Sequence, residues 1–278
     1  MESFEDKVAV ITGGASGIGL GLATALAERG ALVAIADIEE PALARAYSTL
    51  IETTSAQKVA ALEVDVSRYE SVVALRDKVI ERFGRVDLLV NNAGVCTFNP
   101  LPQVSIEDWQ WVIGVDLWGV IHGVKAFVDL MVAQDTEGHI VNTASLAGVI
   151  RGNRIITPYS VAKHGVVALS EALREELRSQ GAKLGVTVLC PAHVRSNAWD
   201  SDRNRPGGRE VRSDIGEAWR SQGGTNPGEP SVLSAAEFAG IVLQAVRAGD
   251  FWVFTDPPRR PALEERFSEI LGAYPSPV

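Results

Sequence analysis

"TGGASGIG", residues 12–19, decides the fold of this chain, because it joins an apolar strand to a helix through closely spaced glycines. The residues before it, "KVAVIT" at 7–12, are β-branched and apolar, and the residues after it have helical apolar spacing. A sharp turn from strand to helix requires the conformational freedom of Gly13, Gly17 and Gly19. The start of the helix then offers backbone N–H groups to an anion. A plain tight turn has the same composition, so the stretch predicts a phosphate-binding turn only together with its place after the first strand.

The same alternation of short apolar runs and amphipathic stretches continues along most of the chain. The short runs are continuous and rich in Val, Ile and Leu, which favours strands buried on both faces of a parallel sheet. We expect strands at 7–12, 31–37, 58–65, 86–94, 139–145 and 185–192. We expect helices near 17–30, 40–54, 68–83, 106–133 and 159–180. A helix near 234–248, a short strand at 251–255 and a terminal helix over 261–274 are expected to complete the sheet.

This order predicts an α/β fold, a doubly wound and mostly parallel sheet with helices on both faces, in a single Rossmann-type domain spanning 1–278. Residues 197–230 break the pattern, because they are rich in Gly, Pro and charged residues. Only one short helix, around 210–221, is expected there. A long irregular stretch inside a compact domain is typical of a functional loop, so we predict a substrate loop or lid at 197–230.

Composition and charge exclude several classes of protein. The chain has 278 residues, of which 46% are hydrophobic, and a formal net charge of −9, which argues against a nucleic-acid partner. Its first residues carry acids where a signal peptide needs positive charge, and no apolar run approaches the roughly 20 residues of a membrane span. The two cysteines form no C-x-x-C motif and the four histidines have no metal-ligand spacing. We therefore expect a soluble, cytoplasmic protein with no metal site and no membrane partner.

Asp37 closes the second expected strand, 18 residues after Gly19. An acid at this point accepts hydrogen bonds from both hydroxyls of an adenosine ribose and repels a 2′-phosphate. The next basic residue along the chain is Arg45, so the pattern favours NAD over NADP. The alternative is that Asp37 merely caps the following helix.

Two further strand ends carry residues suited to the same ligand. Asp65 and Val66 follow the third strand, where they are expected to lie beside an adenine ring. "NNAG" at 91–94 follows the fourth strand, where Asn91 is expected to brace the sheet and Gly94 to admit the ligand closely. Ligands of open α/β sheets bind at the carboxyl ends of the strands, which favours a shared site over separate loops.

"TPYSVAKHG", residues 157–165, places Tyr159 and Lys163 on one face of a helix. A phenol titrates near pH 10 in isolation, but a nearby cation lowers its pKa, and an oxidised nicotinamide adds more positive charge. Tyr159 is then able to exchange a proton with an alcohol or ketone. Ser145, which closes the preceding strand, is placed to hold the substrate oxygen.

These motifs occur in the order seen in short-chain dehydrogenases/reductases, and the resemblance covers nearly all of residues 5–195. It implies a Rossmann fold, NAD, catalytic Ser145, Tyr159 and Lys163, and dimers or tetramers formed through helices 106–133 and 159–180. Lys163 would also bond the nicotinamide ribose. On this resemblance the cofactor-binding residues are Gly13, Ser16, Gly17, Ile18, Gly19, Asp37, Asp65, Val66, Asn92, Ala93, Gly94, Tyr159, Lys163, Pro191, Val194 and Ser196.

The chain departs from the family pattern at three positions. Asp116 stands in "VDLWG", where the family usually has an asparagine that supports a water-linked proton relay, so Asp116 is a fourth catalytic candidate. The alternative is a helix residue that tolerates exchange. Ala192 replaces a glycine, and Ser196 stands where a threonine commonly bonds the carboxamide.

The sequence is more narrowly similar to a bacterial subgroup that includes the Cα-dehydrogenases of lignin aryl-ether breakdown. That similarity implies hydride transfer between NAD and a fairly large apolar or aryl secondary alcohol or ketone. Two alternatives remain open. A lyase or isomerase on the same scaffold would keep Tyr159 and Lys163, whereas a non-catalytic NAD-binding sensor would be expected to lose one of the catalytic residues.

Overall fold

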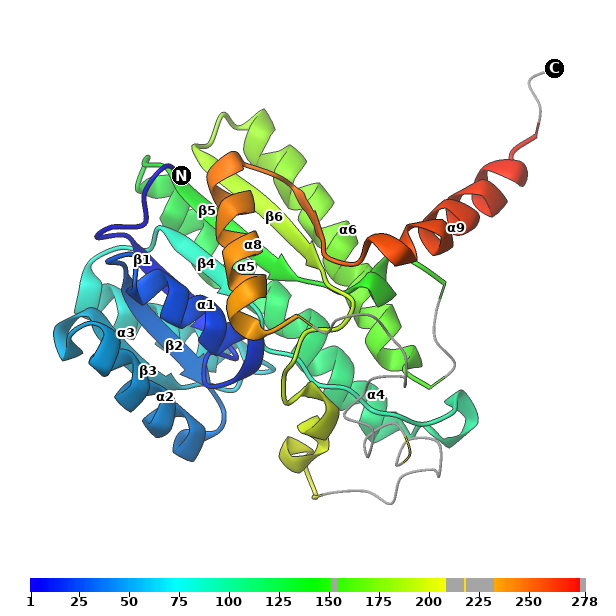
Figure 1. Ribbon diagram of the computed structural model, residues 1–278, viewed down its shortest axis with the longest axis horizontal. Coiled ribbons are helices and arrows are strands. Elements are labelled where there is room, and N and C mark those ends of the chain that lie inside the picture. Colours follow the sequence, from blue (N-terminus) through cyan, green and yellow to red (C-terminus); the bar gives the residue numbers. More distant parts are fainter. Residues whose placement is uncertain (152–154, 209–217, 219–232, 276–278) are drawn as a thin grey trace.

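A computed structural model describes residues 1–151, 155–208, 218 and 233–275. Its centre is a seven-stranded parallel sheet in the order β3-β2-β1-β4-β5-β6-β7 (Figure 1). The strands are β1 (Val8–Thr12), β2 (Leu32–Asp37), β3 (Val59–Glu63), β4 (Leu88–Asn91), β5 (Gly138–Thr143), β6 (Leu184–Cys190) and β7 (Trp252–Phe254). Both β1 and β4 are buried along their whole length, as continuous apolar runs require. The predicted doubly wound α/β fold is confirmed.

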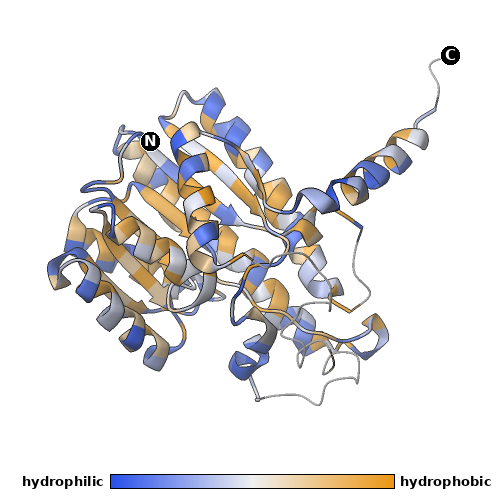
Figure 2. Ribbon diagram, in the orientation of Figure 1, coloured by the Kyte–Doolittle hydropathy of each residue, from blue (hydrophilic) through white to orange (hydrophobic). Residues whose placement is uncertain are grey.

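Helices cover both faces of the sheet (Figure 1). One face packs against α1 (Gly17–Ala27), α2 (Glu40–Thr53) and α8 (Ala235–Ala248). The other packs against α3 (Tyr69–Phe83), α5 (Gly119–Ala133) and α6 (Thr157–Ser179), with α4 (Ile106–Ile113) lying against α6. Figure 2 shows apolar strands between helices whose outward faces are polar. Each face of the sheet therefore has its own apolar core.

The long predicted helix at 106–133 contains a π-helical turn, Gly114–Trp118, between α4 and α5. Such wide turns often occur at functional sites, and this one carries Asp116. The stretch Ile106–Ala133 is long and apolar enough to cross a membrane by length and composition, which the sequence reasoning did not expect. However, 44% of its most apolar window is buried, and α5 packs on α3. Part of its apolar character is thus that of a core helix, with Val120, Phe127 and Met131 of α5 buried.

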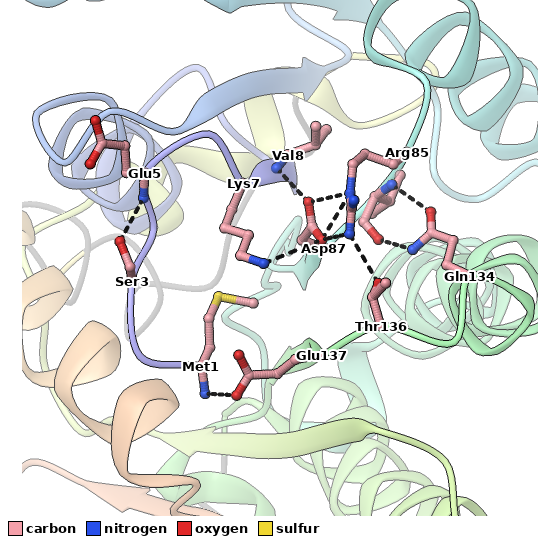
Figure 3. A network of polar contacts seen from close by, with 11 residues as sticks. Met1, Ser3, Glu5, Lys7, Val8, Arg85, Asp87, Gln134, Thr136 and Glu137 are labelled. Atoms are coloured by element: carbon pink, nitrogen blue, oxygen red, sulfur yellow. Dashed lines mark hydrogen bonds and ion pairs between the residues drawn. The ribbon is translucent and has the colours of Figure 1, made fainter.

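A buried carboxylate holds the amino ends of β1 and β4 together (Figure 3). Asp87 is fully buried and accepts hydrogen bonds from the backbone N–H of Val8 at 2.9 Å and from Nη2 of Arg85 at 2.5 Å. The Arg85 guanidinium also donates to Thr136, just before β5. These bonds fix three neighbouring strands at the end opposite their carboxyl ends, so the strand exits are held in register.

The terminal helix α9 (Arg260–Gly272) differs from the prediction, because it projects away from the sheet instead of completing it (Figure 1). It has no buried residue, and Phe267 and Leu271 are among its exposed apolar side chains. It is held by Arg266, which donates to the carbonyl of Val149, by the ion pairs of Arg151 with its glutamates, and by Leu263, which packs against the core on one face of the sheet. Helical periodicity gives a helix but does not say which surface it packs on.

Candidate active site

The glycine-rich turn joins β1 to α1 as predicted, and it lies against two other strand exits. Gly13 and Gly17 have φ angles of +64° and +51°, in the left-handed region that favours glycine. A Cβ at Gly13 would lie 2.8 Å from Cα of Ala93, and one at Gly17 would lie 2.8 Å from Cβ of Ser196. Ser16 occupies the N-cap of α1 but makes no side-chain capping bond. The first N–H groups of the helix are therefore left for a bound anion.

Hydrogen bonds fix the exit of β4 against this turn. The Thr12 hydroxyl accepts from the backbone N–H groups of Asn92 at 2.9 Å and Ala93 at 3.2 Å, while Asn92 Nδ2 donates to the Thr12 carbonyl at 3.0 Å. Asn91 Nδ2 donates to Asn142 Oδ1 at 2.9 Å, so Asn91 braces β4 against β5 as predicted. The role of Thr12 was not predicted, because a threonine at a strand end has no distinctive spacing.

Asp37 is held at the opposite side of the glycine turn. Its carboxylate accepts from the N–H of Ala15 at 3.1 Å and from the N–H of Glu39 at 3.2 Å. Burial raises the pKa of Asp37 because desolvation outweighs these backbone bonds. Glu39, not Asp37, is the N-cap of α2. The capping alternative is therefore wrong, and the carboxylate instead faces a cavity.

One cavity brings together residues from the carboxyl ends of five neighbouring strands. Thirteen of the predicted cofactor-binding residues line it: Gly13, Ser16, Gly17, Ile18, Asp37, Asp65, Val66, Asn92, Ala93, Gly94, Tyr159, Lys163 and Ser196. The other three are not part of its lining. Gly19 is buried in the first turn of α1, the Pro191 carbonyl accepts from Leu146 N–H, and Val194 forms a bridge with Leu233.

Tyr159 and Lys163 share one face of α6, where they meet Asp116. The Lys163 Nζ atom lies 5.5 Å from the centre of the Tyr159 ring, donates to the Thr143 carbonyl at 2.8 Å, and lies 3.3 Å from Asp116 Oδ2. The Lys163 side chain is only 2% exposed, so its charge needs this partner. Asp116 Oδ1 accepts from the N–H of Val95 at 2.7 Å. The carboxylate therefore ties the lysine to the exit of β4.

The ionisation of Tyr159 is governed by burial and by this ion pair. Burial raises the pKa of Tyr159, and the negative charge of Asp116 raises it further, while a hydrogen bond with Ser145 lowers it. Burial also raises the pKa of Asp116, against the opposing charge of Lys163. The sequence reasoning expected the lysine cation to lower the pKa of Tyr159. The net shift is upward, chiefly because burial disfavours the phenolate, and the negative charge of Asp116 adds to it.

An irregular segment, 197–208, lies across the cavity and is anchored on both sides. It contains the 3₁₀ helix Ala198–Asn204. Ser201 Oγ accepts from Cys96 N–H at 2.8 Å and donates to its carbonyl at 3.0 Å, and Arg205 pairs with Asp108 of α4 at 2.9 Å. Most of the predicted loop at 197–230, including the helix expected at 210–221, falls outside the described residues.

Arg203, on this segment, is a site residue that the sequence reasoning missed. Its Nε and Nη2 atoms donate to the two carboxylate oxygens of Glu39 at 3.2 and 2.5 Å. Asn204 Nδ2 donates to the same carboxylate at 2.9 Å. The partners are 164 and 165 positions apart, and no spacing in the sequence brings them together.

A strand exit that leaves helix N–H groups open to an anion, facing a tyrosine beside a lysine, is the arrangement of a Rossmann-type oxidoreductase. Comparison with known proteins agrees. The family model described as short chain dehydrogenase matches residues 7–206, and this chain belongs to the short-chain dehydrogenase family. It is an enzyme of the oxidoreductase class, as predicted.

Three relatives illustrate the similarity. A Cα-dehydrogenase of Sphingobium sp. is 33% identical, with 98% of this chain and 88% of the relative covered. A short-chain dehydrogenase/reductase of Burkholderia phymatum, solved in complex with NAD, is 36% identical with a TM-score of 0.91, covering 100% of this chain and 99% of that chain. The apo form of LigD from Sphingobium sp. is 30% identical with a TM-score of 0.80, covering 99% and 100%.

Proposed function

We propose that the protein transfers a hydride between NAD and a fairly large apolar or aryl secondary alcohol or ketone, with Tyr159 as the general acid and base. The observation that carries this proposal is the constellation of Ser145, Tyr159, Lys163 and Asp116 beside a cavity whose other end presents Asp37. A sensor needs no such set, because proton transfer serves chemistry and not binding.

The residues of the cavity fit NAD along its length. Asp37 offers a carboxylate to an adenosine ribose, and the uncapped start of α1 offers N–H groups to a pyrophosphate. Asp65 and Val66 line the adenine side. The complex of the Burkholderia phymatum relative with NAD supports this choice of cofactor. When bound, NAD supplies the hydride acceptor.

The protein's own groups handle the proton. In alcohol oxidation the Tyr159 phenolate takes the hydroxyl proton while Ser145 Oγ holds the substrate oxygen, and in ketone reduction the phenol returns it. Lys163 lies near the ring, with Nζ 5.5 Å from its centre, and its charge is paired with that of Asp116. Asp116 pairs with Lys163 and accepts a hydrogen bond from the N–H of Val95. We assign it to the catalytic set because it positions Lys163 in this way.

An apolar wall beside Tyr159 supports a large apolar substrate. Cys96, Phe98 and Ile155 form a buried cluster, against which Ile156 and Tyr159 pack. Such a wall favours a substrate with a ring or alkyl group on its carbinol carbon, because these apolar side chains cannot pair with a charged substituent. The similarity to a Cα-dehydrogenase points in the same direction.

The wider organisation completes the proposal. The single domain carries residues 197–230 as a lid over the substrate, and the anchors of 197–208 support that role. The enzyme acts in the cytoplasm as a homotetramer or homodimer, formed through the helices near 106–133 and 159–180. Trp118 and Val161, which are 51% and 48% exposed on these helices, suit such an interface.

A spectrophotometric screen tests the proposal. Secondary alcohols from short aliphatic to bulky benzylic are offered with NAD and with NADP, and the matching ketones with the reduced cofactors. We expect turnover with NAD on a bulky class. Binding of NAD without turnover of any alcohol or ketone would contradict the redox assignment and favour a lyase, an isomerase or a sensor.

A further inference from the structure

The cavity contains a second cation besides Lys163, the guanidinium of Arg203, and it lies at the adenosine end. Asp37, Ile38, Glu39 and Arg203 line the same part of the cavity wall. An arginine at this end of a Rossmann site is what accommodates a 2′-phosphate. No spacing in the sequence predicts an arginine here, since Arg45 is the next basic residue after Asp37.

Glu39 occupies the donors that a phosphate would use. The pair is bidentate, with Nε donating to Oε2 at 3.2 Å and Nη2 to Oε1 at 2.5 Å. This fork of two parallel N–H groups is the geometry in which arginine recognises either a carboxylate or a phosphate. The Glu39 and Arg203 side chains are 26% and 25% exposed, so bulk water screens the pair only in part.

The remaining donors of Arg203 hold it in place. Its Nη1 atom donates to the carbonyls of Asn197 at 3.1 Å and Asp200 at 2.8 Å. These bonds do not involve Glu39, so they remain when Glu39 is removed. Burial lowers the pKa of Arg203, but the hydrogen bond and charge of Glu39 and the charges of Asp200 and Asp37 raise it overall. Asp37 and Arg203 are thus near enough to influence one another.

We propose that Glu39 determines cofactor choice by masking Arg203, so that the guanidinium is withheld from the 2′-phosphate of NADP. This inference rests on the proposed function and extends it. Asp37 acts only by repelling the 2′-phosphate of NADP. Glu39 adds a second negative charge, and by pairing with Arg203 it also removes the cation that would otherwise attract the phosphate. Without Glu39, Arg203 keeps its place on the segment and presents Nε and Nη2 to the cavity.

The test is the equilibrium affinity of Glu39→Ala for adenosine ligands, measured by calorimetry. The ligands are 5′-AMP and adenosine 2′,5′-bisphosphate, which differ only in the 2′-phosphate, followed by NAD and NADP. Two charge-assisted hydrogen bonds become available, so we expect the ratio of bisphosphate to 5′-AMP affinity to rise about tenfold or more. An unchanged ratio would overturn the proposal.

Three variants separate masking from other effects. Glu40→Ala removes the same charge from the next residue, which is exposed and outside the cavity lining, and it should give little gain. Asn204→Ala loosens the segment without removing the ion pair, since Asn204 also bonds Glu39. Glu39→Ala/Arg203→Gln should lose the gain. A gain that persists without Arg203, or that Asn204→Ala reproduces, would refute masking.

The two proposals fail in different ways. If the wild-type protein binds neither 5′-AMP nor NAD, the cofactor assignment itself is wrong. If it binds both and Glu39→Ala shows no change in preference, only the masking role is wrong.

Discussion

The replacement of Asp116 by asparagine should move the pH profile of alcohol oxidation toward acid. Asp116 Oδ2 lies 3.3 Å from Lys163 Nζ, which lies 5.5 Å from the centre of the Tyr159 ring, so the carboxylate is at most about 9 Å from that ring. At an effective dielectric constant of about 20, unit charges at that distance interact by about 2 kcal/mol. Removal of the anion favours the phenolate, so the pKa of Tyr159 falls.

That energy corresponds to a displacement of about 1.4 pH units. The measurement is kcat/KM for alcohol oxidation against pH, whose rising limb reports the base in the free enzyme. Asp116→Asn should shift this limb to lower pH by at least about one unit, while activity is retained. Asp108→Asn is the control, because it removes another buried carboxylate, on α4, that pairs with Arg205 and not with Lys163.

A limb that stays in place would refute the reasoning, because it would show that Asp116 carries no charge that Tyr159 feels. A shift to higher pH would have the same force. Complete loss of activity would show that the carboxylate itself is required in the proton path. The variant also leaves the buried Lys163 without an anion, so we expect unfolding to become easier by about 3 kcal/mol, which denaturant titration measures.

Three further changes test other parts of the structure. Tyr159→Phe should reduce turnover by at least about a hundredfold while NAD binding measured by calorimetry is kept, and normal turnover would exclude the proton-transfer role. Asp37→Ala should weaken the binding of NAD more than that of NADP, since only NAD has a 2′-hydroxyl that donates a hydrogen bond to the carboxylate, and equal losses of affinity would place the ribose elsewhere. His139 is buried with a pKa of about 4, below its ordinary 6.5, because burial disfavours its charge. Below pH 6.5 the unfolded chain binds a proton at His139 that the folded chain does not, so the stabilisation present above pH 6.5 is lost as the pH falls toward 4, by about 3 kcal/mol. The free energy of unfolding of His139→Gln, measured with urea, should therefore change less with pH over that range.

Sequence periodicity predicted the sheet well, because strands buried on both faces must be continuously apolar, as β1 and β4 are. The site residues at strand ends were also predictable, because a parallel sheet brings the carboxyl ends of its strands together at one edge. The placement of α9 was not, because its apolar residues have the spacing of a helix, yet none of them is buried and only Leu263 packs against a core cluster of the described residues. The pairing of Glu39 with Arg203 was also out of reach, because it depends on how one irregular segment lies over the sheet.

Asp116, which stands where the family usually has an asparagine, affects how the ionisation of Tyr159 depends on the bound cofactor. An asparagine would leave the Lys163 cation unneutralised beside Tyr159, whereas Asp116 makes the buried pair neutral. Tyr159 is therefore ionised by its neighbours less readily, since burial and Asp116 both raise its pKa. A further positive charge is then needed for the phenolate to form, and the oxidised nicotinamide ring is such a charge. The reduced ring carries no such charge. The pKa of Tyr159 should therefore depend more strongly on the oxidation state of the cofactor than it would beside an asparagine. The Asp116→Asn variant probes this coupling directly, since it should make the ionisation of Tyr159 less dependent on the cofactor.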